Sequence, residues 1–389
     1  MAVQAGSAEY ALIECTDKVF SLNYEMISVD GSKVTIKTSK TRWLIIAVYI
    51  FYCGISAFQW VEYSIVGNII ARYYHVTVEK VDYTAMAYML FPIPLVIPGS
   101  HIAERIGLRW TNIVGSGLIC LGSWVKIFSV HPDRFLLTLG GQSFLAVSQD
   151  EPKYPPSETR ALQKKEHDGT ERTLVESIKR LMTNASYLIL CNSYGLGIGV
   201  LNALSTMLNQ IVLARFEDGE EFAGRLGLII LVMGMFGSIT FGLILDKTQK
   251  FKETTVTVYL STLCSQIFFT ISILIESNSL TYIAASILGF FISGYLALGY
   301  EMCAEYTYPE SESLATGILN IGNNLYGIIL ILVCSQLKKY YGDVAVHICL
   351  CSALLVGLIL TVMTKDEQRR QNAKRNNKFT DNRVPGLGI

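Results

Sequence analysis

Charged residues are scarce in this sequence. Asp, Glu, Lys and Arg make up 16% of its 389 residues, hydrophobic residues make up 51%, and the mean hydropathy is +0.38. A soluble domain carries about 25% charged residues, so the composition excludes an ordinary soluble protein of this length. It predicts a polytopic membrane protein instead.

Enzyme signatures are also missing. The sequence holds no nucleophile elbow, Walker loop or HExxH pattern, so we expect no enzyme, no catalytic residue and no nucleic-acid partner. Most of the nine cysteines lie inside apolar stretches and none has metal-ligand spacing, which predicts small core residues, no metal site and no cofactor. No secretory signal peptide is expected, because residues 1–42 are polar and of mixed charge.

Long apolar runs dominate the rest of the chain. A membrane span needs about 20 mostly apolar residues whose backbone groups bond within their own helix. The runs predict about ten spans: 43–70, 85–102, 111–130, 135–149, 187–213, 226–245, 256–275, 282–304, 316–337 and 346–363. The fourth, "FLLTLGGQSFLAVSQ", is too short and then breaks into charge and proline, so it is re-entrant or a fragment.

Lysine and arginine in the connections predict the orientation, because cytoplasmic loops are enriched in them. These residues gather before the first predicted span, after the fourth, after the sixth and after the last. The opposite connection "RFEDGEEFAGR" is acidic. Both termini are therefore expected in the cytoplasm. The connection "EYTYPESES" disagrees, because it should be cytoplasmic and yet carries only acids.

Two cytoplasmic helix exits carry an acid followed directly by a base, Glu104–Arg105 and Asp246–Lys247. Such pairs can engage a neighbouring helix end in one conformation and release it in another. A single pair is better explained as an ordinary polar turn. Two pairs at equivalent depth, each behind a glycine, favour the major facilitator fold, which is built from two related halves of six helices.

Longer strings narrow the class to a family. "SAFQWVEYS", "GSGLICLGSWVKIFSV", "PKYPPSE", "STMLNQ", "GFFISGYLALGYE" and "YTYPESESLATGILN" resemble the feline leukaemia virus subgroup C receptor-related family, which are choline and haem transporters of the major facilitator superfamily. The resemblance covers residues 42–366. In this family, two further helices lie between segments that resemble "GQSFLAVSQ" and "PKYPPSE". The resemblance therefore implies that these helices are missing here, because the two segments are joined directly at Gln149–Asp150.

The expected fold class is thus an all-α polytopic membrane protein, a major facilitator fold with an incomplete N-terminal half. We expect a cytoplasmic tail at 1–41, a truncated four-span half at 42–149, a cytoplasmic linker at 150–184, a six-helix half at 185–365 and a cytoplasmic tail at 366–389. The plasma membrane is the expected location. A cavity wall that lacks helices would expose polar groups to lipid, at a cost of several kcal/mol each.

A quaternary ammonium is best held by aromatic faces. Trp60 matches the tryptophan that the family uses against the ammonium; the alternative is an interfacial belt residue. Glu62 replaces a family glutamine. Its carboxylate either strengthens cation binding, or couples transport to a proton, or lies near the outer surface in contact with water, and the last interpretation is slightly favoured. A family tyrosine falls at Asn202, and Tyr194 one to two turns earlier is a substitute.

Further amides extend the candidate substrate site. Asn209 and Gln210 match the family well, and interhelical bonding is favoured over substrate contact. Asn324 stands where the family has a glutamine that faces the substrate alcohol, near Asn320 and Asn323. The partner glutamine of the family's fifth helix has no counterpart.

A cytoplasmic gate is the favoured role for Glu301 and Glu305, which lie four residues apart on one helix face. The alternative is that both carboxylates extend to water.

Three functions remain open. The first is facilitated transport of choline or a related amine such as ethanolamine. The second is haem export, although His101 and His347 lie at span ends and no paired histidines face each other. The third is a transport-inactive splice form that associates with the full-length protein and regulates it.

Overall fold

The computed structural model describes residues 22–29, 32–39, 54–147 (except 57, 61 and 107), 174–216 and 219–373. Side-chain positions are described for these residues except 22–39, 100–112 and 144–147. The chain divides into two compact units. One comprises Met1–Ile55, Tyr154–Arg172 and Arg370–Ile389, and the other comprises Ser56–Lys153 and Thr173–Arg369.

The first unit contains a β-hairpin that the sequence analysis did not predict within the expected tail. Strands β1 (Leu22–Val29) and β2 (Ser32–Ser39) pair antiparallel, from Leu22 opposite Ser39 to Val29 opposite Ser32. Only Asp30 and Gly31 separate the strands, and Asp-Gly is a strong signal for a two-residue hairpin turn.

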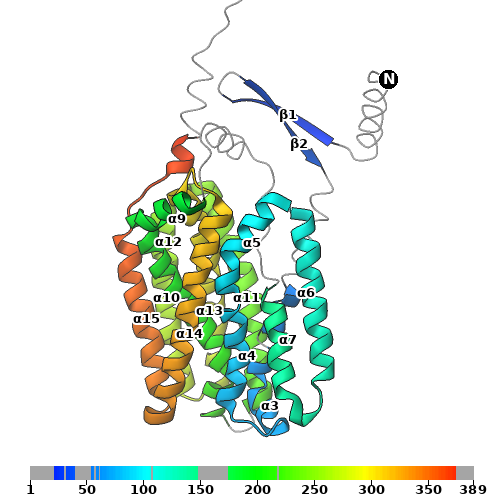
Figure 1. The fold of residues 1–389 in the computed structure, drawn as a ribbon. Helices are drawn as coiled ribbons and strands as arrows, with labels where there is room; N and C mark the ends of the chain where they lie inside the picture. Colours follow the sequence, from blue (N-terminus) through cyan, green and yellow to red (C-terminus); the bar gives the residue numbers. More distant parts are fainter. Residues whose placement is uncertain are drawn as a thin grey trace, which may run out of the picture. The chain divides into compact units, whose positions relative to one another are not determined.

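The second unit is helical (Figure 1). Within 54–65 the described residues are helical, and positions 57 and 61 lie outside the described part. Next come α3 (Gly67–Tyr73), α4 (Val78–Leu90), α5 (Pro92–Ile106), α6 (Leu108–Phe128), the 3₁₀ turn η1 (Pro132–Arg134) and α7 (Phe135–Val147). After residue 173 come α9 (Leu174–Thr183), α10 (Ala185–Leu213), α11 (Gly219–Thr248), α12 (Phe251–Leu274), α13 (Asn278–Thr307), α14 (Glu312–Tyr341) and α15 (Asp343–Met363). We call the helices through α7 the N-terminal half and α9–α15 the C-terminal half.

Seven helices in the described part are long and apolar enough to cross a membrane. Six are α10–α15, as predicted for the second half, and the seventh is Val78–Gly99, which runs through α4 into α5. The remaining predicted spans correspond to residues 43–70, which are described only in part, to α6 and to α7. Helix α7 covers Phe135–Val147 of the fourth predicted span, and the residues after it lie outside the described part. The all-helical, polytopic class is therefore confirmed for the second unit.

Helices α11 and α13 pack through glycines that bring their backbones together. A Cβ atom at Gly237 would lie 1.9 Å from the carbonyl oxygen of Phe290, and one at Gly289 would lie 2.5 Å from that of Ile230. Membrane helices that associate without a strong hydrophobic drive rely on such close contact. These glycines fix the spacing of the C-terminal half.

We predict that Gly237→Ala lowers stability and that Gly242→Ala on the same helix does not. The first methyl group would meet the backbone of α13, at a cost of about 1–3 kcal/mol. The second has no atom within 4 Å, and alanine is favoured over glycine in a helix by up to ~1 kcal/mol. Thermal unfolding midpoints in detergent measure the difference, and equal midpoints for the two variants would contradict the packing described.

Candidate functional site

The two halves meet along a face of α4 and α5 and the helical residues before them. From the N-terminal half, Met89 belongs to the buried core that is otherwise formed by the C-terminal half, and Trp60, Met86 and Ile97 pack against that core. Trp60, the predicted ammonium contact, therefore lies where the halves come together.

The Trp60 ring is held by α4. It stacks on Tyr88 with 6.5 Å between ring centroids and 25° between ring planes. The Tyr88 hydroxyl in turn lies 2.5 Å from the Ser56 hydroxyl and 3.1 Å from the Ser56 carbonyl oxygen. The Trp60 indole N–H is buried, and no acceptor for it is found among the described residues. The site thus presents an oriented aromatic ring and an unused donor.

Glu62 is partly exposed, with 27% of its side chain accessible to solvent, and its carboxylate has a charged partner within the protein. It forms an ion pair with Lys126 of α6, whose side chain is 11% exposed. The Lys126 ammonium also lies 5.0 Å from the Tyr63 ring centroid. Because an ionisable group in a span is costly unless paired, this pair leaves little free charge on Glu62 for a substrate.

Tyr194 and Asn202 of α10 lie in packed surroundings. Tyr194 is 0% exposed and its ring lies 5.9 Å from that of Tyr295 and 5.8 Å from that of Tyr300. The Asn202 side chain donates a 2.8 Å hydrogen bond to the Asn323 side chain of α14. Tyr194 is thus enclosed by protein and packed against other tyrosine rings, and its role as a substitute for the family's cage tyrosine stays a prediction.

Polar contacts join the two halves at one end of the bundle. Gln210 of α10 donates to the Asp82 carboxylate of α4 at 2.8 Å, and Lys338 of α14 donates to the Gln210 carbonyl at 2.7 Å. Asn209 donates to the carbonyl of Ile65 at 2.6 Å. These amides hold helices together, which is the role that the sequence analysis favoured for Asn209 and Gln210.

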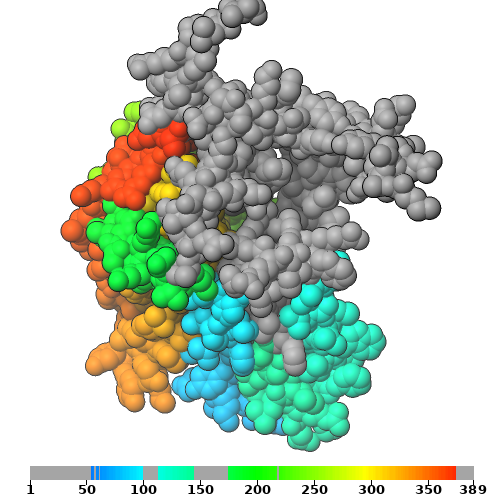
Figure 2. Space-filling view, turned by 45° about the horizontal axis from the view of Figure 1, so that its top comes forward, coloured from blue at the N-terminus to red at the C-terminus, as the bar shows by residue number. Residues whose placement is uncertain are grey.

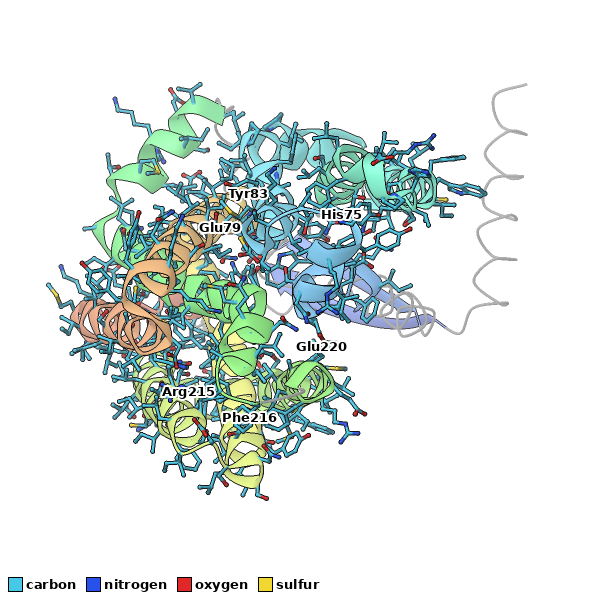
Figure 3. The ribbon with its side chains drawn as sticks, turned by 90° about the horizontal axis from the view of Figure 1, so that it is seen from below. His75, Glu79, Tyr83, Arg215, Phe216 and Glu220 are labelled. Carbon is cyan, nitrogen blue, oxygen red and sulfur yellow. The ribbon has the colours of Figure 1, made fainter. Side chains whose placement is uncertain are left out.

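More contacts surround this end. Asn68 bonds to Glu220 at the start of α11, and Lys339 lies 3.9 Å from Glu79. Figure 3 looks onto this end, with His75, Glu79 and Tyr83 on the side of the N-terminal half and Arg215 and Phe216 on the side of the C-terminal half. The halves are thus bridged at the end where α3 and α4 meet α10, α11 and α14.

Arg215 stabilises the connection between α10 and α11 at the same end. Its guanidinium lies 2.7 Å from the Asp343 carboxylate at the start of α15 and 3.6 Å from Glu276. The hydrogen bond with Asp343 is the main cause of the raised pKa of Arg215. The connection is thereby tied to two other helix ends.

Three asparagines of α14 differ in their partners. Asn320 accepts a 3.0 Å bond from the Tyr300 hydroxyl and Asn323 accepts from Asn202, so both mediate helix contacts. Asn324 is half-buried, and no hydrogen bond to its side chain is found among the described residues. Asn324 is therefore the amide of this group that is free for a substrate.

The predicted gating residues lie at the opposite end. Glu104 and Arg105 belong to α5, but their side chains lie outside the described part. Asp246 and Lys247 are exposed at the end of α11. Glu305 is fully buried in α13, so it does not extend to water, whereas Glu301 is half-buried.

A polar cleft of about 440 Å³ also lies at this end, in the C-terminal half. It lies between α9 with the start of α10, the end of α13, and the segment after α15, and Arg180, Glu310, Lys365, Glu367 and Arg369 line it. Figure 2 shows α9 (green) beside the C-terminal segment (red). Arg180 pairs with Glu310 at 3.7 Å and Arg369 with Glu367 at 2.6 Å, so most of its charges neutralise each other.

No cluster of three or more potential metal ligands occurs among the described side chains. His347 is 0% exposed between α12 and α15, with Thr270 at 3.3 Å. The arrangement is that of two helical halves with oriented polar and aromatic groups at their interface. With seven helices of membrane length, the described part is that of a polytopic membrane protein.

The comparisons with known proteins agree. The Major Facilitator Superfamily model matches residues 135–331. The E. coli fucose:proton symporter FucP shares the fold, with a TM-score of 0.55 at 10% identity over 82% of this chain and 99% of that chain.

Sequence relatives are more specific. The choline/ethanolamine transporter FLVCR2 of Rattus norvegicus is 33% identical, over 87% of this chain and 77% of the relative. The choline/ethanolamine transporter FLVCR1 of Felis catus is 29% identical, over 86% of this chain and 74% of the relative. The chain belongs to the FLVCR1 and FLVCR2 family of the major facilitator superfamily. It is therefore a membrane transporter and not an enzyme, as predicted.

Sequence analysis missed Asp82, Tyr88 and Lys338. Asp82 stands within an apolar stretch, "VDYTAMAYMLF", and an ionisable residue in a span is a functional candidate by default. That signal was available. The pairing with Gln210 was not, because it depends on how α4 and α10 pack.

We predict that Asp82 and Gln210 are energetically coupled. Gln210→Leu removes a donor from a buried carboxylate and should cost about 1–3 kcal/mol, as should Asp82→Leu. The double variant should cost less than the sum by about 0.5–3 kcal/mol, because it leaves neither group unpaired. Thermal or denaturant unfolding of the four proteins in detergent gives this coupling, and additive effects would show that the bond contributes nothing.

Proposed function

We propose that this chain facilitates movement of choline or a related amine, such as ethanolamine, across the membrane. The observation that carries the proposal is the position of Trp60. Its ring lies between the two halves, stacked on Tyr88. In addition, relatives that match this chain over most of its length and of their own are named choline/ethanolamine transporters. No specific observation favours haem export or a regulatory role.

The chemistry of Trp60 fits a quaternary ammonium. Such a cation cannot donate a strong hydrogen bond, and it binds the negative face of an aromatic ring, most favourably tryptophan. Stacking on Tyr88 fixes the orientation of the ring before a substrate arrives, so little side-chain entropy is lost on binding. The pairing of Glu62 with Lys126 leaves the aromatic face as the main attraction for the cation.

Amide groups complete the proposed site. Asn324 has a free side-chain amide on α14, where the family resemblance places a group that faces the substrate alcohol. Asn202, at the position of the family's tyrosine, donates a hydrogen bond to Asn323, the residue before Asn324. We therefore assign Trp60 to the ammonium and Asn324 to the hydroxyl group, with Asn202 orienting α14.

Transport by this fold requires that the two halves open alternately at each end. The contacts of Asp82, Gln210 and Lys338 support a state in which the α3 end is closed. Glu104–Arg105, Asp246–Lys247, Glu301 and Glu305 stand at the other end and are the proposed gating residues there. The acid and base pairs would form and break as that end closes and opens.

The alignment with the rat relative supports a shortened chain. The alignment extends over 422 positions and includes 87% of the 389 residues of this chain, which is about 338 residues. At the remaining positions, about 84, the relative has residues and this chain has a gap. Two spans with their loops require a gap of this order. We propose that this gap falls at Gln149–Asp150, which lies outside the described residues. We also propose that the two halves have the limits expected from the sequence, 42–149 and 185–365.

The distribution of lysine and arginine supports an orientation with both termini in the cytoplasm. The α3 end then faces outward. We propose the plasma membrane as the location, where an acidic outer connection that includes Glu220 and Glu221 would attract cations.

Trp60→Ala tests the proposal, with Trp124→Ala as its matched control. Trp124 is 56% exposed on α6 and takes no part in the interface. In liposomes that contain the purified chain, choline uptake at low concentration should fall about tenfold or more in Trp60→Ala, because the ring is lost from the cation. Uptake in Trp124→Ala should match the parent.

Two outcomes would contradict the proposal. One is choline uptake that Trp60→Ala leaves unchanged at equal amounts of protein. The other is a parent chain that takes up neither choline nor ethanolamine above the level of empty liposomes.

A further inference from the structure

Hydrogen bonds hold the walls of the polar cleft in the C-terminal half together. The Asn184 side chain, at the start of α10, donates to the Tyr306 carbonyl of α13 at 2.9 Å, and the Tyr306 hydroxyl donates to the Lys365 carbonyl at 2.7 Å. Ser186 of α10 donates to the Glu367 carboxylate at 2.9 Å. These bonds connect α10, α13 and the segment after α15, so the cleft of about 440 Å³ is formed before any ligand arrives.

The arginines of the cleft are more exposed than the carboxylates that pair with them. The side chain of Arg180 is 60% exposed and that of Glu310 is 7% exposed. The side chain of Arg369 is 47% exposed and that of Glu367 is 26% exposed. A guanidinium has five N–H donors, so one carboxylate does not use them all. The carboxylates therefore orient the two arginines and leave donors of both available at the surface of the cleft.

Lys365 adds a third cation. It lines the cleft, it is exposed, and it forms no ion pair with a carboxylate among the described residues. The charged residues that line the cleft are thus three cations and two carboxylates, which leaves one positive charge in excess. The cleft is therefore suited to an anion that accepts several hydrogen bonds.

The cleft lies beside an apolar helix end. Helix α15 ends at Met363, two residues before Lys365, and Ile359, Val362 and Met363 are each at least 50% exposed. Exposed apolar side chains on a membrane-spanning helix contact acyl chains, so the residues that follow the end of the helix lie at the level of the lipid headgroups. A lipid could therefore place its headgroup in the cleft and its chains along the end of α15.

We propose that this cleft binds the headgroup of an anionic phospholipid of the phosphatidylinositol phosphate class. Arg180, Lys365 and Arg369 donate charge-assisted hydrogen bonds to the phosphate oxygens, and arginine matches phosphate in two-point geometry. The volume of about 440 Å³ lies within the range of about 300–1,000 Å³ for small-molecule sites, so a phosphorylated sugar has room. In the proposed orientation this end is cytoplasmic, where basic pockets between membrane helices bind such headgroups.

The test measures the thermal unfolding midpoint of the full chain in detergent micelles that contain increasing fractions of phosphatidylinositol phosphate or of phosphatidylcholine. The midpoint should rise with the first lipid and not with the second, because a ligand that binds the folded state stabilises it. A third series adds soluble inositol bisphosphate, which has no acyl chains, and it should raise the midpoint less than the lipid does.

Variants locate the effect. In Lys365→Gln the lipid fraction that gives half of the rise should increase about tenfold, because a hydrogen bond between charged groups is lost. Lys365→Arg keeps the charge and should respond as the parent does. Lys179→Gln is the matched control, because Lys179 is exposed on α9 next to Arg180 but does not line the cleft.

Several outcomes would overturn the inference. One is a parent midpoint that neither lipid raises, or that both raise equally. Another is an equal weakening in Lys179→Gln and Lys365→Gln, which would show a response to surface charge alone. Inositol bisphosphate that stabilises as strongly as the lipid would assign the cleft to a free phosphate compound instead. If Lys365→Gln does not fold, Arg180→Gln decides. None of these measurements involves transport, so the inference and the proposed function can fail separately.

Discussion

The contact of Asp82 with Gln210, next to Lys338, is the interaction on which the rest of the account depends. A buried carboxylate between membrane helices must be bonded, since lipid offers it no water. Gln210 of α10 donates to it and accepts at its own backbone carbonyl from Lys338 of α14, so these bonds fix how the two halves meet at the α3 end. They place the start of α4 against the end of α10, and Tyr88 and Trp60 follow from that placement.

Several charged groups near Trp60 and at the α3 end are paired within their own halves. Glu62 is paired with Lys126, and Arg215 with Asp343. What remains for a ligand is the aromatic ring of Trp60 and the amide of Asn324. Such groups discriminate by shape and by donor count, because none of them carries a charge. This is consistent with a transporter that must bind a cation and also release it, which a free carboxylate would hinder.

Sequence reasoning predicted all six long helices α10–α15, with ends that differ by at most seven residues from the observed ones, because apolar runs of membrane length have few alternatives in lipid. It missed the β1–β2 hairpin, although Asp30–Gly31 between two alternating segments was a usable signal. The substrate site was harder. Trp60 came from a family resemblance, whereas the Lys126 partner of Glu62 and the enclosure of Tyr194 depend on contacts between helices distant in the chain.

The most direct measurement asks whether transport stops when the α3 end is held closed. Cysteines replace Asp82 and Gln210, and choline and ethanolamine uptake into liposomes is measured before and after a short cleavable thiol crosslinker, with the equally treated parent chain as reference. The account predicts uptake that the crosslink abolishes and that cleavage restores, because the α3 end must open in every cycle. Uptake that continues at the same rate with the halves linked would contradict it, as would a parent chain that transports neither amine.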